Sequence, residues 1–214
     1  MTSHVIVQAA VEGYVDEAVL GRVAGAVGAG LGTVYGKRGK HHLQNKIHGY
    51  CAAARHWPWV VLVDLDHDAS CAPDLRQLWL PSVAPHLCFR VAVRAVEAWL
   101  LADWERFSQF LGVPASGIRR DVEMLEDPKE AVVQLAAHSR RSAIREDMTP
   151  RPGSGRRVGP SYSSRLIEFV EDTRGGWRPD AAAERSDSLR RCFRALSRLV
   201  NELGQGHAEA ANRR

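Results

Sequence analysis

Acidic residues at a regular spacing stand out in the first half of the chain. Asp64, Asp66 and Asp68 alternate directly after the apolar segment 59–63, and Glu12 follows an earlier apolar segment. Residues two apart in extended backbone point to the same side, so the aspartates can converge if the chain stays extended. Converging carboxylates repel one another, and a hard divalent cation removes that repulsion. The pattern predicts a site for Mg²⁺ or Mn²⁺, one ion or two, that acts on phosphate esters.

Alternating strands and helices must position these acids. The segment 59–63 (WVVLV) is apolar on both faces, which is typical of a central strand in a parallel sheet. Asp16 and Glu17 would lie in the first turn of a helix, where the helix dipole favours acids. The expected strands cover residues 4–11, 31–35, 59–63 and 87–93, and the expected helices cover 15–27, 42–54, 74–83, 95–102 and 104–111. This order predicts an α/β fold with a small parallel sheet flanked by helices. Ligands bind beyond the carboxyl ends of such strands, where Glu12 and Asp64 would meet.

The second half is expected to be a helical extension. Helices are predicted at 127–138, at 162–172 and at 186–203, the last amphipathic and ended by Gly204. Residues 139–160 hold three prolines, three glycines and many arginines, and are predicted to form a long loop. We therefore expect an α/β core over 1–112 and a helical extension over 113–214, packed on the core as one unit.

Two basic segments suggest contact with a polyanion. The net charge is only +4, but Lys37, Arg38 and Lys40 lie in a glycine loop, and Arg156 and Arg157 lie in the arginine-rich segment. Clustered basic residues attract a phosphate backbone, so nucleic acid, DNA rather than RNA, is the expected partner. The alternative is that the arginine-rich segment is simply a solvated, flexible loop.

Other metal and redox readings fit less well. An EF-hand that started at Asp64 would need Gly and Glu where Ala69 and Leu75 stand. Asp68 occupies the fifth position of the motif, where haloacid-dehalogenase phosphatases have Thr or Val, and a nucleotide-sugar transferase usually needs more chain. The four cysteines are far apart, which favours reduced thiols. No apolar run approaches the roughly 20 residues that cross a membrane, and the first residues do not resemble a signal peptide. We expect a cytoplasmic location and no membrane partner.

The carboxylate arrangement resembles Toprim, the fold shared by topoisomerases, primases and OLD-type nucleases. The resemblance is carried by AAVEGYVDEAVL, with Glu12, and by VVLVDLDHDASC, with Asp64 and Asp66. The chain is more closely similar to a bacterial Toprim-like family of undefined function, related to the Toprim domains of OLD-type nucleases. That similarity adds the segment EAWLLAD over 97–103, Lys129, and the segment SDSL over 186–189.

The resemblance implies roles for these residues. Glu12 would be a metal ligand or general base, and Asp64 and Asp66 would be metal ligands. Asp68 is a candidate metal ligand from its spacing alone, or else a flanking residue. Glu97 would add a ligand, or else only brace its helix. Lys129 would neutralise transition-state charge, or else be an exposed helix lysine. Tyr162 is interpreted as a core or cap residue.

The implied function is a Mg²⁺-dependent nuclease acting on nucleic acid, with phage defence as the implied context. One alternative is a non-catalytic Toprim-fold partner of an ATPase. OLD nucleases carry an ATPase domain, and no Walker motif stands here, so any ATPase would be a separate chain. Another alternative is a metal-dependent phosphotransfer enzyme on a small substrate, which a closed, narrow pocket around Asp64 would favour.

Overall fold

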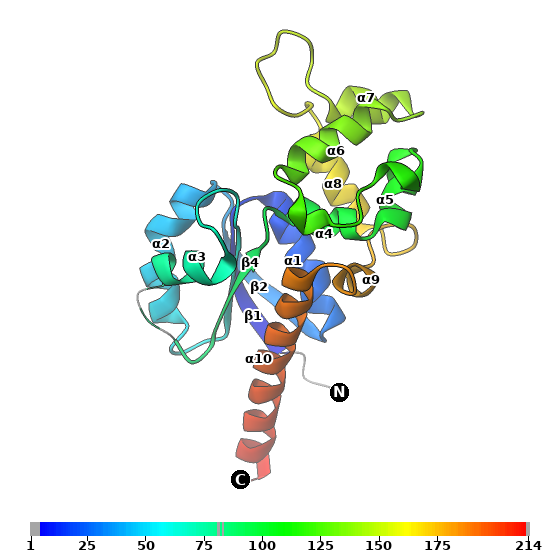
Figure 1. Cartoon of the computed structure of the whole chain (residues 1–214). Helices are drawn as coiled ribbons and strands as arrows, with labels where there is room; N and C mark the ends of the chain where they lie inside the picture. Colours follow the sequence, from blue (N-terminus) through cyan, green and yellow to red (C-terminus); the bar gives the residue numbers. More distant parts are fainter. Residues whose placement is uncertain (1–4, 81, 83, 213–214) are drawn as a thin grey trace.

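A four-stranded parallel sheet forms the centre of the computed structural model (Figure 1), which describes residues 5–80, 82 and 84–212, with side chains up to residue 205. The strands are β1 (Val5–Val11), β2 (Ala29–Gly36), β3 (Trp59–Asp64) and β4 (Leu87–Ala92), in the order β2-β1-β3-β4. All pairs are parallel. Every residue of β3 is buried, as expected for a central apolar strand. The predicted α/β fold with a parallel sheet is confirmed.

Helices cover both faces of this sheet and one of its edges. They are α1 (Tyr14–Ala26), α2 (Lys40–Ala53), α3 (Ala72–Trp79), α4 (Val96–Ala102), α5 (Trp104–Leu111), α6 (Pro128–Ala137), α7 (Ser142–Met148), α8 (Tyr162–Glu171), α9 (Pro179–Ala183) and α10 (Asp187–Asn212), with short 3-10 turns at Ala115–Gly117 and Val122–Met124. The α2 and α3 side buries Leu43 and Leu75 against Val61 and Val63. The opposite side carries α1 and α10 (Figure 1).

The strand order creates a switch point between β1 and β3. From β1 the chain passes through α1 on one face to β2, and from β2 it returns through α2 on the other face to β3. The two connections leave a crevice at the carboxyl ends of β1 and β3, which is where ligands bind in open parallel sheets. Glu12 follows β1 and Asp64 ends β3, so both acids lie at this crevice.

The helical region α4–α9 packs beside this carboxyl edge (Figure 1). One buried cluster runs from Val7 and Val60 on the sheet to Trp99 in α4 and Trp177 just before α9. The long helix α10 returns to contact β4 and β1, so the end of the chain helps to cover the sheet. The expected division at residue 112 stays a prediction, although the buried cluster contains residues from both sides of it.

The predicted loop 139–160 is wrong in its first part. Helix α7 occupies residues 142–148 and buries Ile144 and Met148, which lie four residues apart on one face. The surrounding arginines concealed this short apolar pattern. Residues 149–160 do form a loop, which projects beyond α7 (Figure 1).

Two predicted helix ends also change. Helix α10 continues through Gly204 to Asn212, so the expected stop is wrong. A glycine inside a helix costs only about 1 kcal/mol, which neighbouring helical residues outweigh. Helix α3 ends at Trp79. The predicted ends at Val83 for this helix and at His4 for the first strand fall outside the described residues. Within the described ranges, no helix is both long and apolar enough to span a membrane.

Candidate active site

Glu12 and Asp64 are tied together at the switch point between β1 and β3. The backbone N–H of Asp64 donates to Oε1 of Glu12 over 2.8 Å. Oδ1 of Asp64 accepts from the backbone N–H of Val96, the first residue of α4, over 2.9 Å. The side chain of Asp64 thus reaches across the sheet edge and joins the start of α4 to β3. The predicted meeting of Glu12 and Asp64 at one edge is confirmed.

A pocket of about 190 Å³ opens next to Asp64. Its walls come from elements far apart in the sequence: the start of α1, the end of β3, the start of α4, and helices α6 and α8. They supply the polar side chains Asp16, Asp64, Glu97, Lys129 and Tyr162. The three acids are 7%, 6% and 2% exposed in that order, so they are withdrawn from bulk water. We call these three acids with their enclosing walls the carboxylate pocket.

Burial perturbs the acids around this pocket strongly. It raises the pKa of Glu12 to about 7, against the hydrogen bond from Asp64, which lowers it. Burial, and then the neighbouring charges of Glu12 and Glu97, raise the pKa of Asp16 to about 7. The pKa values of Asp64 and Glu97 are also raised, with burial as the largest cause. Desolvation together with mutual repulsion is the usual origin of such shifts, and such groups are typical of functional sites.

Lys129 is the basic side chain that lines the pocket. Its Nζ lies 3.8 Å from Oε1 of Glu97, and this carboxylate is the main cause of the raised pKa of Lys129. The hydroxyl of Tyr162 donates to the same Oε1 over 3.3 Å. Lys129 lies on α6 with its side chain 45% exposed, as the reading of an exposed helix lysine expects, and its ammonium also faces a buried acid.

Two carboxylate oxygens at the pocket have no hydrogen-bond partner among the described residues. They are Oδ1 of Asp16 and Oε2 of Glu97, both fully buried. A buried anionic oxygen without a partner is costly, and a divalent cation bound by oxygen ligands removes that cost. Asp16, Asp64 and Glu97 are thus the donors whose chemistry fits Mg²⁺ or Mn²⁺. Within the described part of the chain, however, no three His, Cys, Asp or Glu side chains stand close enough to form a ready-made metal site.

Asp66 and Asp68 are directed elsewhere. Both are about half exposed, and their carboxylates bind Nζ of Lys40 over 2.5 and 2.7 Å. Asp66 has a φ of 47°, in the left-handed region, so the expected extended run after β3 is wrong. A turn forms there, which the N–H of Asp68 closes by donating to the carbonyl of Leu65 over 3.2 Å. Their roles as metal ligands stay predictions.

The predicted basic residues divide into paired and unpaired groups. Lys40 is held by Asp66 and Asp68, Lys37 lies 3.2 Å from Glu17, and Arg157 binds Asp127. Arg38 and Arg156 are exposed, and neither guanidinium has an ion pair among the described residues. Within the predicted basic set, these two are the side chains with charge left for an external phosphate.

Sequence reasoning missed Asp16 and underrated Tyr162. Asp16 was explained by the helix dipole alone, although it stands four residues after Glu12 and in the first turn of a helix that starts at the sheet edge. That spacing was the available signal, since a helix leaving a strand end directs its first turn towards the same edge. Tyr162 gave no comparable signal, because α8 reaches the pocket from 65 residues beyond Glu97.

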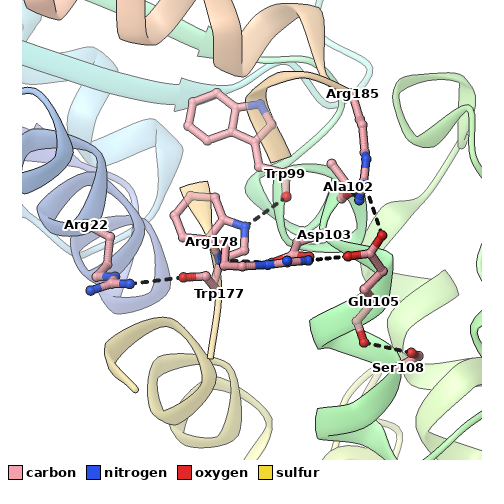
Figure 2. Close-up of polar contacts among 9 residues, drawn as sticks. All are labelled: Arg22, Trp99, Ala102, Asp103, Glu105, Ser108, Trp177, Arg178 and Arg185. Atoms are coloured by element: carbon pink, nitrogen blue, oxygen red, sulfur yellow. Dashed lines mark hydrogen bonds and ion pairs between the residues drawn. The ribbon is translucent and has the colours of Figure 1, made fainter. Parts of the chain in front are cut away.

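The motif over 97–103 has a second, structural end. Asp103 is fully buried and accepts from the backbone and guanidinium of Arg178, at 2.9 Å and 2.5–3.0 Å (Figure 2). Arg178 also binds Glu105, which Arg185 contacts from the other side. We call this group the Asp103 cluster. It holds the C-terminal end of α4 against the segment that leads into α9.

The indole groups of the motif region complete the bracing of α4. Nε1 of Trp177 donates to the carbonyl of Trp99 over 3.2 Å (Figure 2). Nε1 of Trp99 donates to Oγ of Ser188 over 2.7 Å, and that hydroxyl donates to Glu123. The segment 186–189 therefore contributes a buried hydrogen-bond network rather than a reactive group. Its effect is to fix the helix that presents Glu97.

Searches against family models, curated proteins and solved structures found no match to this chain.

Proposed function

We propose that this protein is a Mg²⁺-dependent nuclease with a Toprim-like arrangement, acting on phosphodiester bonds of nucleic acid. The observation that carries the proposal is the carboxylate pocket. Asp16, Asp64 and Glu97 face one small pocket. Among the residues that the structure describes, Lys129 is the one lysine or arginine on its walls, and two acid oxygens lack partners. A stable core would pair or remove such groups.

The charge balance of the pocket supports a cation as the missing component. Three buried acids meet one lysine, and Glu12 adds a fourth acid that is hydrogen-bonded to the Asp64 backbone. When bound, Mg²⁺ or Mn²⁺ supplies Lewis-acid activation of a phosphoryl oxygen and of the attacking water. Asp16, Asp64 and Glu97 would hold it, and a second ion remains part of the proposal.

The protein's own groups would then divide the remaining work. Glu12, with its pKa near 7, is suited to take a proton from the attacking water at neutral pH. Lys129 would stabilise negative charge that develops on the phosphate oxygens. Tyr162 and the Val96 N–H hold Glu97 and Asp64 in place, so the site needs little rearrangement when substrate arrives.

Exposed arginines support a polyanionic substrate. Arg38 precedes α2 and Arg156 lies in the loop 149–160, whose last residues reach the pocket through Val158. Guanidinium groups in these positions would hold a phosphate backbone as it crosses the pocket. A cytoplasmic location, where the four free cysteines stay reduced, and a role in phage defence belong to the same proposal.

The test is cleavage of labelled DNA and RNA by the purified chain with Mg²⁺, Mn²⁺ or EDTA. Glu12→Gln and Asp64→Asn should each abolish metal-dependent cleavage, and Asp16→Asn should reduce it at least as much as Asp68→Asn. Asp74→Asn is the matched control, because Asp74 is a carboxylate outside the pocket that bonds to Ser70. Cleavage that survives both Glu12→Gln and Asp64→Asn would refute the assignment. Absence of cleavage, with tight binding of an ATPase chain, would favour the non-catalytic partner.

A small-substrate phosphotransfer enzyme is the second candidate. The pocket volume of about 190 Å³ favours it, since that space admits one phosphate group and little else. This candidate predicts metal-dependent hydrolysis of a small phosphate ester that excess oligonucleotide does not inhibit. Competitive inhibition by the oligonucleotide would favour the nuclease.

A further inference from the structure

A second hollow adjoins the carboxylate pocket. It has a volume of about 570 Å³, within the range of small-molecule binding sites, and lies between α1, β2 and α8. Apolar walls come from Leu31, Val34 and Ile167, while Gly21 leaves room. Polar groups line it as well: Glu17, Arg22 and Glu171. We call this hollow the β2 groove.

Tyr14 joins the two hollows, because it lines both the β2 groove and the carboxylate pocket. Its side chain is 62% exposed, which is unusual for an aromatic residue that begins a helix next to buried acids. Nζ of Lys37 lies 5.6 Å from the centre of its ring. The ammonium of Lys37 is paired with Glu17, so the exposed ring and the adjoining hollow are what form a platform for a planar ligand.

The side chains of the groove indicate which part of such a ligand would bind there. The charges at the groove balance, because Glu17 pairs with Lys37 and Arg22 offsets Glu171. The groove therefore has no surplus positive charge for a phosphate, whereas its carboxylates can accept hydrogen bonds from the amino groups of bases. The phosphate would instead lie in the carboxylate pocket, beside Lys129. A nucleotide spans these two places with its base in the groove and its phosphate at the acids.

We propose that Tyr14 and the β2 groove bind the base of an unpaired nucleotide whose phosphodiester enters the carboxylate pocket, so that the substrate is a single strand or an unpaired end. This inference rests on the proposed nuclease function and names its substrate class. A base inside a duplex is stacked on its neighbours and must leave the stack to reach Tyr14. The acids of the pocket are also too deeply buried to meet the rigid backbone of a duplex.

Binding can be measured apart from cleavage, with fluorescein-labelled oligonucleotides and Ca²⁺ in place of Mg²⁺. The wild-type chain should bind a single-stranded oligonucleotide about tenfold more tightly than the matching duplex. Tyr14→Ala should weaken single-strand binding by about tenfold, the usual effect of losing one stacked base, while Tyr14→Trp should retain it. Trp57→Ala is the control, because Trp57 is equally exposed, at 68%, but precedes the opposite end of β3.

A second variant fills the groove without touching Tyr14. A Cβ added at Gly21 would meet only Leu31, at an ordinary distance of 3.9 Å, so Gly21→Leu should fold and even favour helix α1. It should weaken single-strand binding as Tyr14→Ala does. Gly25→Leu is its control, since Gly25 lies on the same helix in open space outside the groove.

Equal affinity for single strand and duplex, or losses that the two control variants share, would overturn the proposal. A mononucleotide such as dTMP that competes as well as the oligonucleotide would overturn it in favour of a free-nucleotide site. Cleavage in Mg²⁺ is scored separately. Binding that depends on Tyr14 without any cleavage would refute the nuclease and keep this site, whereas cleavage and binding unchanged in Tyr14→Ala would refute this site alone.

Discussion

The two ends of the 97–103 motif handle a buried acid in opposite ways. At one end, Asp103 is fully buried and Arg178 satisfies it with backbone and guanidinium bonds. At the other end, Glu97 is 2% exposed, yet within the described part of the chain one of its oxygens has no partner and its nearest cation is 3.8 Å away. Glu97 lies in helix α4 and Asp103 is its C-cap residue, so both acids have the same local secondary structure. The difference between them comes from the residues that pack around each end of the helix. It indicates that the Asp103 cluster serves stability, while the carboxylate pocket keeps an unmet demand for positive charge.

Substitution of Arg178 in the Asp103 cluster should have the largest effect on stability. Arg178→Met would leave the buried Asp103 without the guanidinium and with the backbone N–H of residue 178 alone, and should lower the free energy of unfolding by about 3 kcal/mol. Chemical denaturation measures it. Arg190→Met is the control, since Arg190 pairs with Asp187 on the exposed side of α10 and should change stability by less than about 1 kcal/mol. Similar losses for the two variants would mean that the Asp103 cluster is no more important than a surface ion pair.

The acids at the carboxylate pocket should make the stability of the protein depend on pH. Glu12 and Asp16 have pKa values raised to about 7, from 4.5 and 3.8. Their protonated forms favour the folded state, so their contribution is fully present below the unfolded pKa values and is lost as pH rises through about 7. Without divalent metal, the melting temperature should therefore fall between about pH 5 and pH 8.

Two substitutions, and a measurement with added Mg²⁺, test whether Glu12 and Asp16 cause this pH dependence of the melting temperature. Glu12→Gln and Asp16→Asn should each flatten the fall, because the replaced group no longer titrates. Mg²⁺ should restore stability mainly at the high-pH end, where the acids are ionised and able to bind it. A melting temperature that rises from pH 5 to pH 8 in EDTA would contradict the raised pKa values.

The third prediction removes the unpaired acid itself. Glu97→Gln replaces a buried anion by a neutral group of the same shape, so in EDTA the free energy of unfolding should change by less than about 1 kcal/mol or increase. The stabilisation that Mg²⁺ gives the wild-type chain should be largely lost. Calorimetry with and without Mg²⁺ tests both statements. A loss of several kcal/mol in EDTA would show that Glu97 only braces its helix.

The smallest expected effect concerns the exposed acids. Asp68→Asn removes one of two carboxylates on Lys40, both about half exposed, and should cost less than about 1 kcal/mol. The loss should shrink further in high salt, which screens exposed pairs. A larger, salt-insensitive loss, measured by the same denaturation method, would place Asp68 with the buried acids.

The sequence by itself determined the parallel sheet and the meeting of Glu12 with Asp64. Strand β3 is apolar on both faces, which only a central parallel position satisfies, and the acids at strand ends then share one edge by topology. The motif over 97–103 was also visible, although its division into Glu97 at the pocket and Asp103 in a structural cluster was not.

Tertiary structure alone decided which charges meet. The backbone of Asp66 is not extended, and Asp66 and Asp68 both bind Lys40. Asp16, which the sequence explained by the helix dipole, lines the carboxylate pocket. Tyr162 reaches Glu97 only because α8 packs against α1. The periodicity of a sequence reports which face of an element is apolar, but contacts between side chains on different elements depend on how those elements pack. For that reason the sequence located the edge of the sheet, and the fold selected the acids that remain unpaired there.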